Sequence, residues 1–144
     1  MQTGTRKQQV GIIAAVLVTA AAVWANIGGF WWGSDPKWWN VLATVGYLLF
    51  WCGLHRCCPG RSVGRMVLAF GMGTLLNGIV SLGVVAWDLS WLTAPAMLLA
   101  LVFAVPLYGL DGLLRGNNTA FWVAVAALGV LWTAAGLLRR QRRE

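Results

Sequence analysis

Residues 10–32, VGIIAAVLVTAAAVWANIGGFWW, form an uninterrupted stretch without a charged side chain. A helix of about 20 apolar residues is long enough to cross the hydrocarbon core of a bilayer, so this stretch predicts a membrane-spanning helix. Arg6 and Lys7 precede it, and basic residues before a shorter apolar run are also typical of a cleaved signal peptide. Because the apolar run continues as far as Trp32, we expect a span that stays in the protein.

The same pattern recurs in four further apolar stretches, at residues 36–54, 66–87, 94–110 and 119–138. The gaps between them are short, which predicts antiparallel neighbouring helices, and none has room for a separate domain. We therefore expect a single all-α transmembrane domain over residues 1–144, built as a bundle of five membrane-spanning helices.

The composition of the chain excludes an ordinary water-soluble domain. Hydrophobic residues make up 59% of the sequence and charged residues 10%, whereas soluble domains contain about 25% charged residues. The net charge is +7, but the Lys and Arg residues flank the apolar stretches, where such residues set orientation and meet anionic lipid headgroups. We therefore expect the lipid bilayer, and no nucleic acid, as the partner of these charges.

The distribution of basic residues leaves two topologies open. Five spans place six of the 11 Lys and Arg residues on the N-terminal side of the membrane, whereas a fourth stretch that turns back would place nine there. The positive-inside rule favours the second split, and Pro106 predicts a kink within the fourth stretch. We take five spans with the N-terminus and Arg61 inside and with Asp35 and Glu144 outside as the prediction. Four spans with a kinked or re-entrant fourth stretch are the alternative, and a third possibility is that the weak bias permits both orientations.

Tryptophan is unusually abundant, with ten residues. In the five-span arrangement six of them gather at one face, which is typical of an aromatic belt at the membrane interface. A second interpretation is an aromatic cup that holds a flat or cationic ligand by stacking and cation–π contacts. Its candidate ligand-binding residues are Trp38, Trp39, Trp87 and Trp91.

Two asparagines are the most polar residues inside the predicted spans, Asn26 in the first and Asn77 in the third. A buried amide needs a hydrogen-bond partner, so we expect each to bond a neighbouring helix, and Asn77 to bond the first span. The alternative is that the two amides bind a ligand in a pocket or pore. Small residues recur every four positions along both stretches, which predicts close packing between the first and third spans.

Two short motifs resemble the tryptophan-rich sensory protein and translocator family. Pro36-Lys37-Trp38-Trp39-Asn40 is similar to the Trp- and Pro-rich first loop of that family, and Leu75-Leu76-Asn77 is similar to a Leu-Asn element in its third span. The resemblance implies a bundle of five helices that binds porphyrins or sterols. The chain departs from the family pattern in two places, because no Pro-Pro follows Trp39 and the fifth stretch lacks a Pro-Tyr-Leu-x-Trp motif.

Soft metal ligands follow the second stretch. His55, Cys57 and Cys58 are close in sequence, and two thiolates with an imidazole suit a soft metal ion. The vicinal cysteines resemble those of mercury-transport membrane proteins, but the pair that those proteins carry in the first helix is absent here. The alternatives are ordinary thiols at the interface and lipid attachment sites.

The sequence contains no Ser/His/Asp set, no paired carboxylates and no Gly-rich phosphate loop, so we expect no catalytic residues and no enzyme. The spans also hold no ionisable side chain in their interior, which disfavours a proton-coupled pump. We predict a non-enzymatic protein of the plasma membrane that serves as an accessory subunit, with a membrane-protein partner or a second copy. The alternative is a small-molecule binder, transporter or channel. The sequence indicates no particular cofactor.

Overall fold

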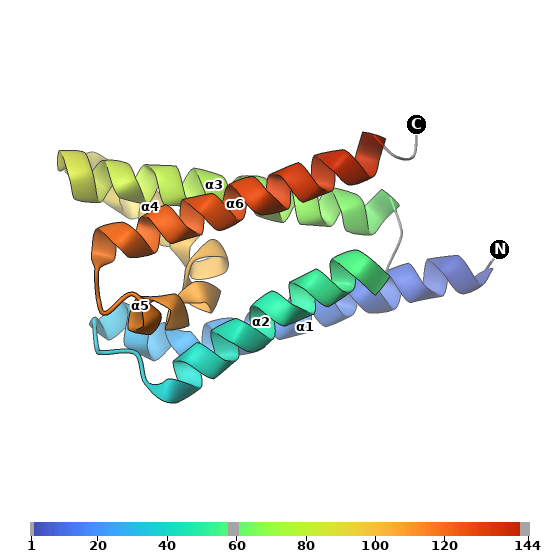
Figure 1. The fold of residues 1–144 in the computed structure, drawn as a ribbon, viewed down its shortest axis with the longest axis horizontal. Coiled ribbons are helices and arrows are strands. Elements are labelled where there is room, and N and C mark those ends of the chain that lie inside the picture. The colour runs from blue at the N-terminus through green and yellow to red at the C-terminus, as the bar shows by residue number, and fades with distance from the viewer. Residues whose placement is uncertain (1, 58–60, 142–144) are drawn as a thin grey trace.

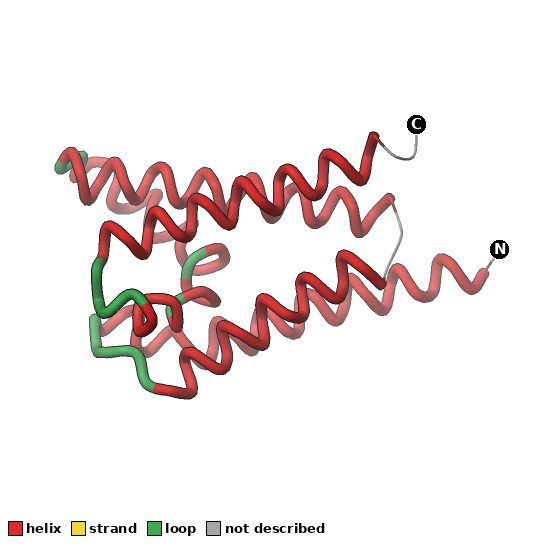
Figure 2. Tube along the Cα trace, viewed as in Figure 1, coloured by secondary structure: helices red, strands yellow, loops and turns green. Residues whose placement is uncertain are grey.

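The structure is a computed structural model that describes residues 2–57 and 61–141 (Figure 2). Four helices are long, and their bounds are α1 Gln2–Trp32, α2 Trp38–Cys57, α3 Arg61–Trp87 and α6 Asn118–Gln141. Between α3 and α6 the chain forms shorter pieces, namely the 3-10 helix η1 Ser90–Leu92, α4 Thr93–Phe103, the 3-10 helix η2 Val105–Leu107 and α5 Gly109–Leu113. The predicted all-α class is confirmed across the described residues, none of which lies in a strand.

The long helices are arranged as two antiparallel pairs (Figure 1). Helix α1 lies against α2, and α3 lies against α6 along much of its length. The short pieces fill one end of the molecule, where α4 packs on α3 while η2 and α5 pack on α1 and α2. The segment between α3 and α6 therefore joins the two pairs.

This segment turns back within the bundle. The chain bends by 61° between Ser90–Phe103 and Val105–Leu113, and Figure 1 shows α5 returning to the end of the molecule at which α4 begins. The bend occurs in η2 at Pro106, which has no backbone N–H for an α-helical hydrogen bond. We call residues 90–113 the re-entrant hairpin.

The predicted bundle of five spans is wrong. Within residues 2–57 and 61–141, three segments are long and apolar enough to cross a membrane, Gln8–Trp32, Ser62–Trp87 and Asn118–Leu138, and the bent hairpin adds a fourth only if it is one broken span. Helix α2 does not reach the same apolarity, because Trp, Asn, Tyr, His and Arg interrupt its apolar residues. The physical reason for the error is that hydropathy reports the length of an apolar run and not whether the run turns back. The alternative of four spans with a kinked or re-entrant fourth stretch agrees with the bend in this segment.

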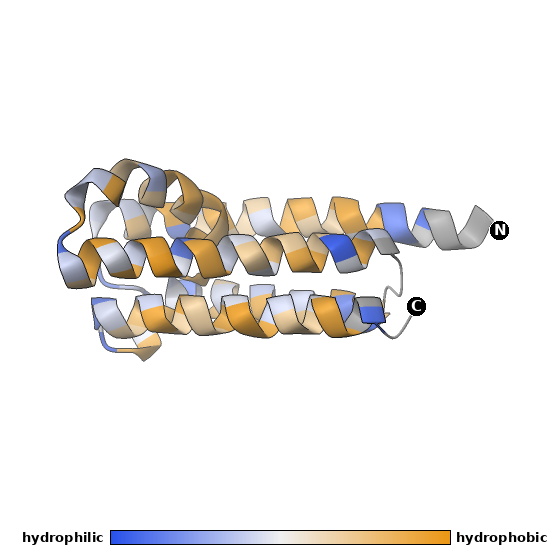
Figure 3. Cartoon of the chain, turned by 90° about the horizontal axis from the view of Figure 1, so that it is seen from above, coloured by the Kyte–Doolittle hydropathy of each residue, from blue (hydrophilic) through white to orange (hydrophobic). Residues whose placement is uncertain are grey.

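Basic residues gather at the end of the molecule that holds both termini. Among the described residues, the helix turns at that end contain Arg6, Lys7, Arg56, Arg61, Arg65, Arg139 and Arg140, and those at the opposite end contain Lys37 and Arg115. Figure 3 shows apolar residues along the helices between the two ends. This uneven split is the one that the positive-inside rule favours.

We expect both termini to lie on the same side of the membrane, with Asp35 on the other side. A reporter that is active only in the cytoplasm should then be active when fused to either terminus and inactive when inserted after Asp35. The reason is that α2, although less apolar than α1, α3 and α6, runs beside α1 along the bundle as a fourth crossing, while the hairpin returns to its starting end. Opposite results at the two termini would show an odd number of crossings and contradict this arrangement.

Glycines allow α3 and α6 to approach each other closely, and they are Gly71, Gly78, Gly129 and Gly136. A Cβ added to Gly78 would lie 2.7 Å from the Ala126 backbone nitrogen, and one added to Gly129 would lie 2.5 Å from the Leu75 Cα. On each helix the two glycines are seven residues apart, a spacing that keeps one face of a helix against its neighbour. We call these four residues the glycine seam.

The small residues that recur every four positions contact the hairpin at two points. A Cβ added to Gly29 of α1 would lie 2.5 Å from the Tyr108 ring, and one added to Gly73 of α3 would collide with the Phe103 ring. The predicted packing of the first span directly on the third is therefore wrong at these positions. Hairpin residues occupy the space that the small residues leave.

An aromatic cluster joins the two helix pairs in the interior. Trp51 of α2 stacks on Phe70 of α3 with ring centroids 4.5 Å apart. Phe70 also contacts Phe103 of α4 and Trp132 of α6, and Tyr47 lies beside Trp51. Trp51 is therefore a core residue, unlike the tryptophans of an interfacial belt.

Candidate functional site

Polar side chains from α1 and α2 hold the tip of the re-entrant hairpin. Asn26 Nδ2 and Thr44 Oγ1 both donate hydrogen bonds to the Pro106 carbonyl, at 3.3 and 3.0 Å. Gly109 N donates to Thr44 Oγ1 at 3.0 Å. Because a backbone group in the hydrocarbon core has no water to bond, these side chains satisfy the groups that the bend releases.

A second asparagine supports the first. Asn40 Nδ2 donates to Asn26 Oδ1 at 2.9 Å and to the Ala25 carbonyl at 3.0 Å, while Asn40 Oδ1 accepts from Lys37 N at 2.8 Å. The prediction that Asn26 bonds a neighbouring helix is thus confirmed. The roles of Asn40 and Thr44 were not found from sequence, because single polar residues in an apolar helix do not show which distant segment they face.

Residues 104–109 are buried throughout. Close packing holds these residues in place in addition to the hydrogen bonds. The Tyr108 hydroxyl donates to the Ser34 carbonyl, and the Tyr108 ring meets Phe30 edge-on at 5.8 Å. Both lone pairs of the Pro106 carbonyl are used within the chain. The tip of the hairpin is therefore held rigidly and forms a fixed border of the surfaces beside it.

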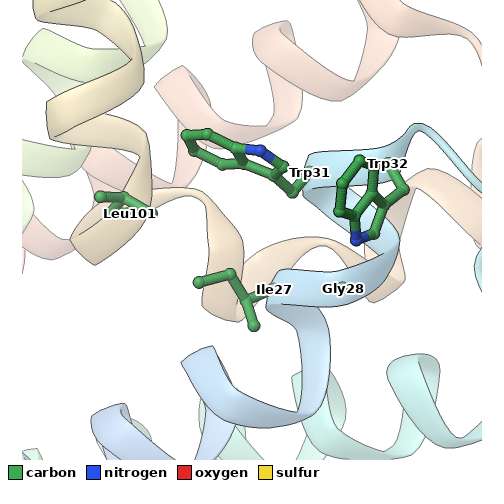
Figure 4. Close-up of a pocket in the computed structure, with 5 residues that line it drawn as sticks. All are labelled: Ile27, Gly28, Trp31, Trp32 and Leu101. Atoms are coloured by element: carbon green, nitrogen blue, oxygen red, sulfur yellow. The ribbon is translucent and has the colours of Figure 1, made fainter.

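A groove of about 360 Å³ lies beside the hairpin, between the end of α1 and α4, and its lining residues are Ile27, Gly28, Trp31, Trp32 and Leu101. In Figure 4 the side chains of Trp31 and Ile27 both extend toward the helix that carries Leu101. No lining residue is charged or carries an acidic or basic group. We call this feature the Trp31–Trp32 groove.

The four tryptophans predicted to form an aromatic cup lie on the surface. Trp38, Trp87 and Trp91 are each at least 70% exposed, and Trp39 meets Trp38 edge-on with centroids 5.9 Å apart. Lys37 Nζ lies 4.8 Å from the centroid of the Trp39 ring. Among the described residues, no ring contact joins Trp38 or Trp39 to Trp87 or Trp91. The tryptophans that do border a recess, Trp31 and Trp32, were assigned from sequence to the interfacial belt.

Asn77 is fully buried on α3, but neither atom of its amide has a hydrogen-bond partner among the described residues. The prediction that it bonds the first helix is therefore wrong. The physical reason is the arrangement of the helices, because α3 packs mainly on α6 and α4 while α1 packs on α2 and η2.

The soft-ligand cluster lies at the end of α2 and extends beyond it. Cys57 is the last residue of the helix and is exposed, His55 lies in the last turn, and Cys58 falls outside the described residues. Among the residues that the structure describes, no group of three His, Cys, Asp or Glu side chains is close enough to hold a metal ion. A site completed by Cys58 stays a prediction.

No known protein family, curated protein or solved structure matches the chain. The resemblance to the tryptophan-rich sensory protein and translocator family thus depends on two short motifs, one at the start of α2 and one on α3. The re-entrant hairpin also differs from the bundle of five spans that this resemblance implies.

Proposed function

We propose that the protein is a non-enzymatic integral membrane protein that binds an apolar, lipid-like molecule in the Trp31–Trp32 groove. The observation that carries this proposal is the groove itself. Its volume of about 360 Å³ lies within the range of about 300–1,000 Å³ that is common for small-molecule sites.

The lining of the groove indicates the chemistry of the ligand. With no charged side chain present, the part of the ligand that enters must be neutral and apolar, such as an acyl or isoprenoid chain. Gly28 has no side chain to fill the groove, and a Cβ added there would meet no atom within 4 Å. Indole rings favour the membrane interface, so the two tryptophans would guide the chain of a ligand whose polar head stays among the lipid headgroups.

The fixed hairpin supports binding by pre-organisation. Leu101 forms one wall on α4, and the tip that follows α4 is held by Asn26 and Thr44. A wall that is already in place loses little conformational entropy when a ligand binds. In this arrangement the basic end of the molecule faces the cytoplasm, and the groove lies near the opposite face of the plasma membrane.

Filling the groove should reduce binding. In nanodiscs that contain a phospholipid with a photoreactive group at its acyl end, we expect adducts on residues 27–32 and on Leu101. Gly28→Leu should lower the adduct yield at least about fourfold, because the burial of at least one methylene group of the ligand, about 0.8 kcal/mol, is lost. Gly46→Leu on α2 is the control, since its Cβ also meets nothing within 4 Å. Equal labelling of all lipid-facing helices, unchanged by Gly28→Leu, would contradict the proposal.

An accessory subunit is the second candidate, and one surface favours it. Ala21 and Ala25 are exposed on α1 beside Trp24, which is 85% exposed. Small residues that face outward let another membrane helix approach closely. Mass measurement in a mild detergent should then show a homodimer or a co-purified partner, which Ala21→Leu removes. A monomer that still labels in the groove would support the binder alone.

A further inference from the structure

Two buried polar side chains on α3 have no hydrogen-bond partner among the described residues. They are Asn77, with 0% exposure, and Ser81, with 3%. Thr74, on the same helix, behaves differently, because its hydroxyl donates to the Phe70 carbonyl of its own helix at 2.9 Å. Burying a polar group without a hydrogen-bond partner is unfavourable, so an unpartnered side chain at the edge of a cavity points to a partner from outside the chain.

The two residues lie one turn apart, at positions i and i+4, and therefore share one face of α3. Ser81 borders a cavity of about 80 Å³ between α3, α4 and α6. The walls opposite Ser81 are Ala96, Met97 and Ala100 of α4 and Trp122 of α6. The small alanines leave the space that a larger side chain would fill.

The chemistry of the cavity limits what it can hold. No charged side chain lines it, so a bare ion would be strongly disfavoured. An amide offers both a donor and an acceptor, and so does a hydroxyl group. A volume of about 80 Å³ admits only a few non-hydrogen atoms.

We propose that this cavity binds the hydroxyl end of a small neutral molecule, with Ser81 bonding the hydroxyl and Thr93 lining the same cavity. The hydroxyl donates one hydrogen bond and accepts another, and the short apolar body lies against Ala96, Ala100 and the Trp122 ring. Two sources supply this chemistry, a free short-chain alcohol and the hydroxyl of a neutral membrane lipid such as diacylglycerol.

The cavity is separate from the Trp31–Trp32 groove. The groove is bordered by α1 and by Leu101 on one side of α4, and the cavity by α3, α6 and a different set of α4 residues. Loss of binding at one site therefore leaves the other site testable.

Cysteine protection tests the proposal in the full chain. Cys52, Cys57 and Cys58 are first replaced by serine, and Thr93→Cys, at an exposed position that lines the cavity, is then treated in nanodiscs with methyl methanethiosulfonate, a small neutral thiol reagent. 1-Butanol, or diacylglycerol in the nanodisc, should slow the reaction, and Ser81→Ala should raise the ligand concentration needed for the same protection about fivefold, the factor expected from one net hydrogen bond. Ser90→Cys, at an exposed position, is the control and should react at the same rate with and without either compound.

Each outcome bears on the proposal. Protection by butanol identifies a free alcohol as a sufficient ligand, and protection by diacylglycerol alone identifies a lipid hydroxyl. Adding Ser81→Ala should weaken the protection while Thr93→Cys still reacts. A failure of Thr93→Cys to react, or a reaction that neither compound slows, would overturn the proposal and leave water as the partner of Ser81. Should Thr93→Cys not fold, Met97→Cys, which also lines the cavity, provides the same measurement.

Discussion

Gly109→Ala should lower the free energy of unfolding by about 3 kcal/mol, the upper part of the range for overpacking a tight site. The added Cβ would lie 2.5 Å from the Asn40 carbonyl carbon and 2.7 Å from Thr44 Oγ1. Because the Asn40 carbonyl belongs to the helix backbone, it cannot turn away. The tip of the hairpin would have to move, which breaks the hydrogen bond from Gly109 N to Thr44 Oγ1.

Equilibrium unfolding in mixed detergent micelles, followed by circular dichroism, measures this effect. Gly46→Ala is the matched control, because its Cβ meets nothing within 4 Å and alanine is the better helix former by about 0.5–1 kcal/mol. We therefore expect the control to be unchanged or slightly more stable. Equal stability of the two variants would show that the tip is not held as tightly as described.

Gly129→Ala should lower the free energy of unfolding by about 2–3 kcal/mol, since it separates the two helices of the tightest pair. Its Cβ would lie 2.5 Å from the Leu75 Cα, a backbone atom that moves only with the whole of α3. Gly73→Ala should have a smaller effect, because the atoms that its Cβ meets belong to the Phe103 ring, which can rotate.

The same unfolding measurement compares these variants, with Gly53→Ala on α2 as the reference, since its Cβ meets no atom within 4 Å. The expected order of destabilisation is Gly129→Ala, then Gly73→Ala, then Gly53→Ala. A Gly73 variant less stable than the Gly129 variant would contradict the assignment of the glycine seam as the main contact between α3 and α6.

Much of the secondary structure could be predicted from the sequence, because apolar length is a local property. The stretches 10–32, 66–87 and 119–138 correspond closely to α1, α3 and α6. The path of the fourth stretch could not be derived in this way. Pro106 marked the bend, but whether the chain passes through or returns depends on Asn26 and Thr44, which lie 80 and 62 positions away from it.

The candidate sites were less predictable than the helices. Asn26 was identified because an amide in an apolar stretch is conspicuous, and Asn77 for the same reason, but the sequence did not show that the first is satisfied and the second is not. Trp31 and Trp32 were indistinguishable in sequence from the other interfacial tryptophans. Their importance comes from Leu101, which only the fold places beside them.

The way in which the hairpin tip is held has a consequence for biosynthesis. The side chains that donate hydrogen bonds to the Pro106 carbonyl belong to α1 and α2. These two helices leave the ribosome well before residues 104–109. Helices α1 and α2 can thus pair in the bilayer before the hairpin inserts, and the hairpin then packs on this pair. Helix α6 packs on α3 afterwards. A circular permutant that begins at α3 would insert the hairpin before α1 and α2 have paired. Its polar backbone would then be exposed to lipid until the last two helices are made, at the cost of several kcal/mol per group.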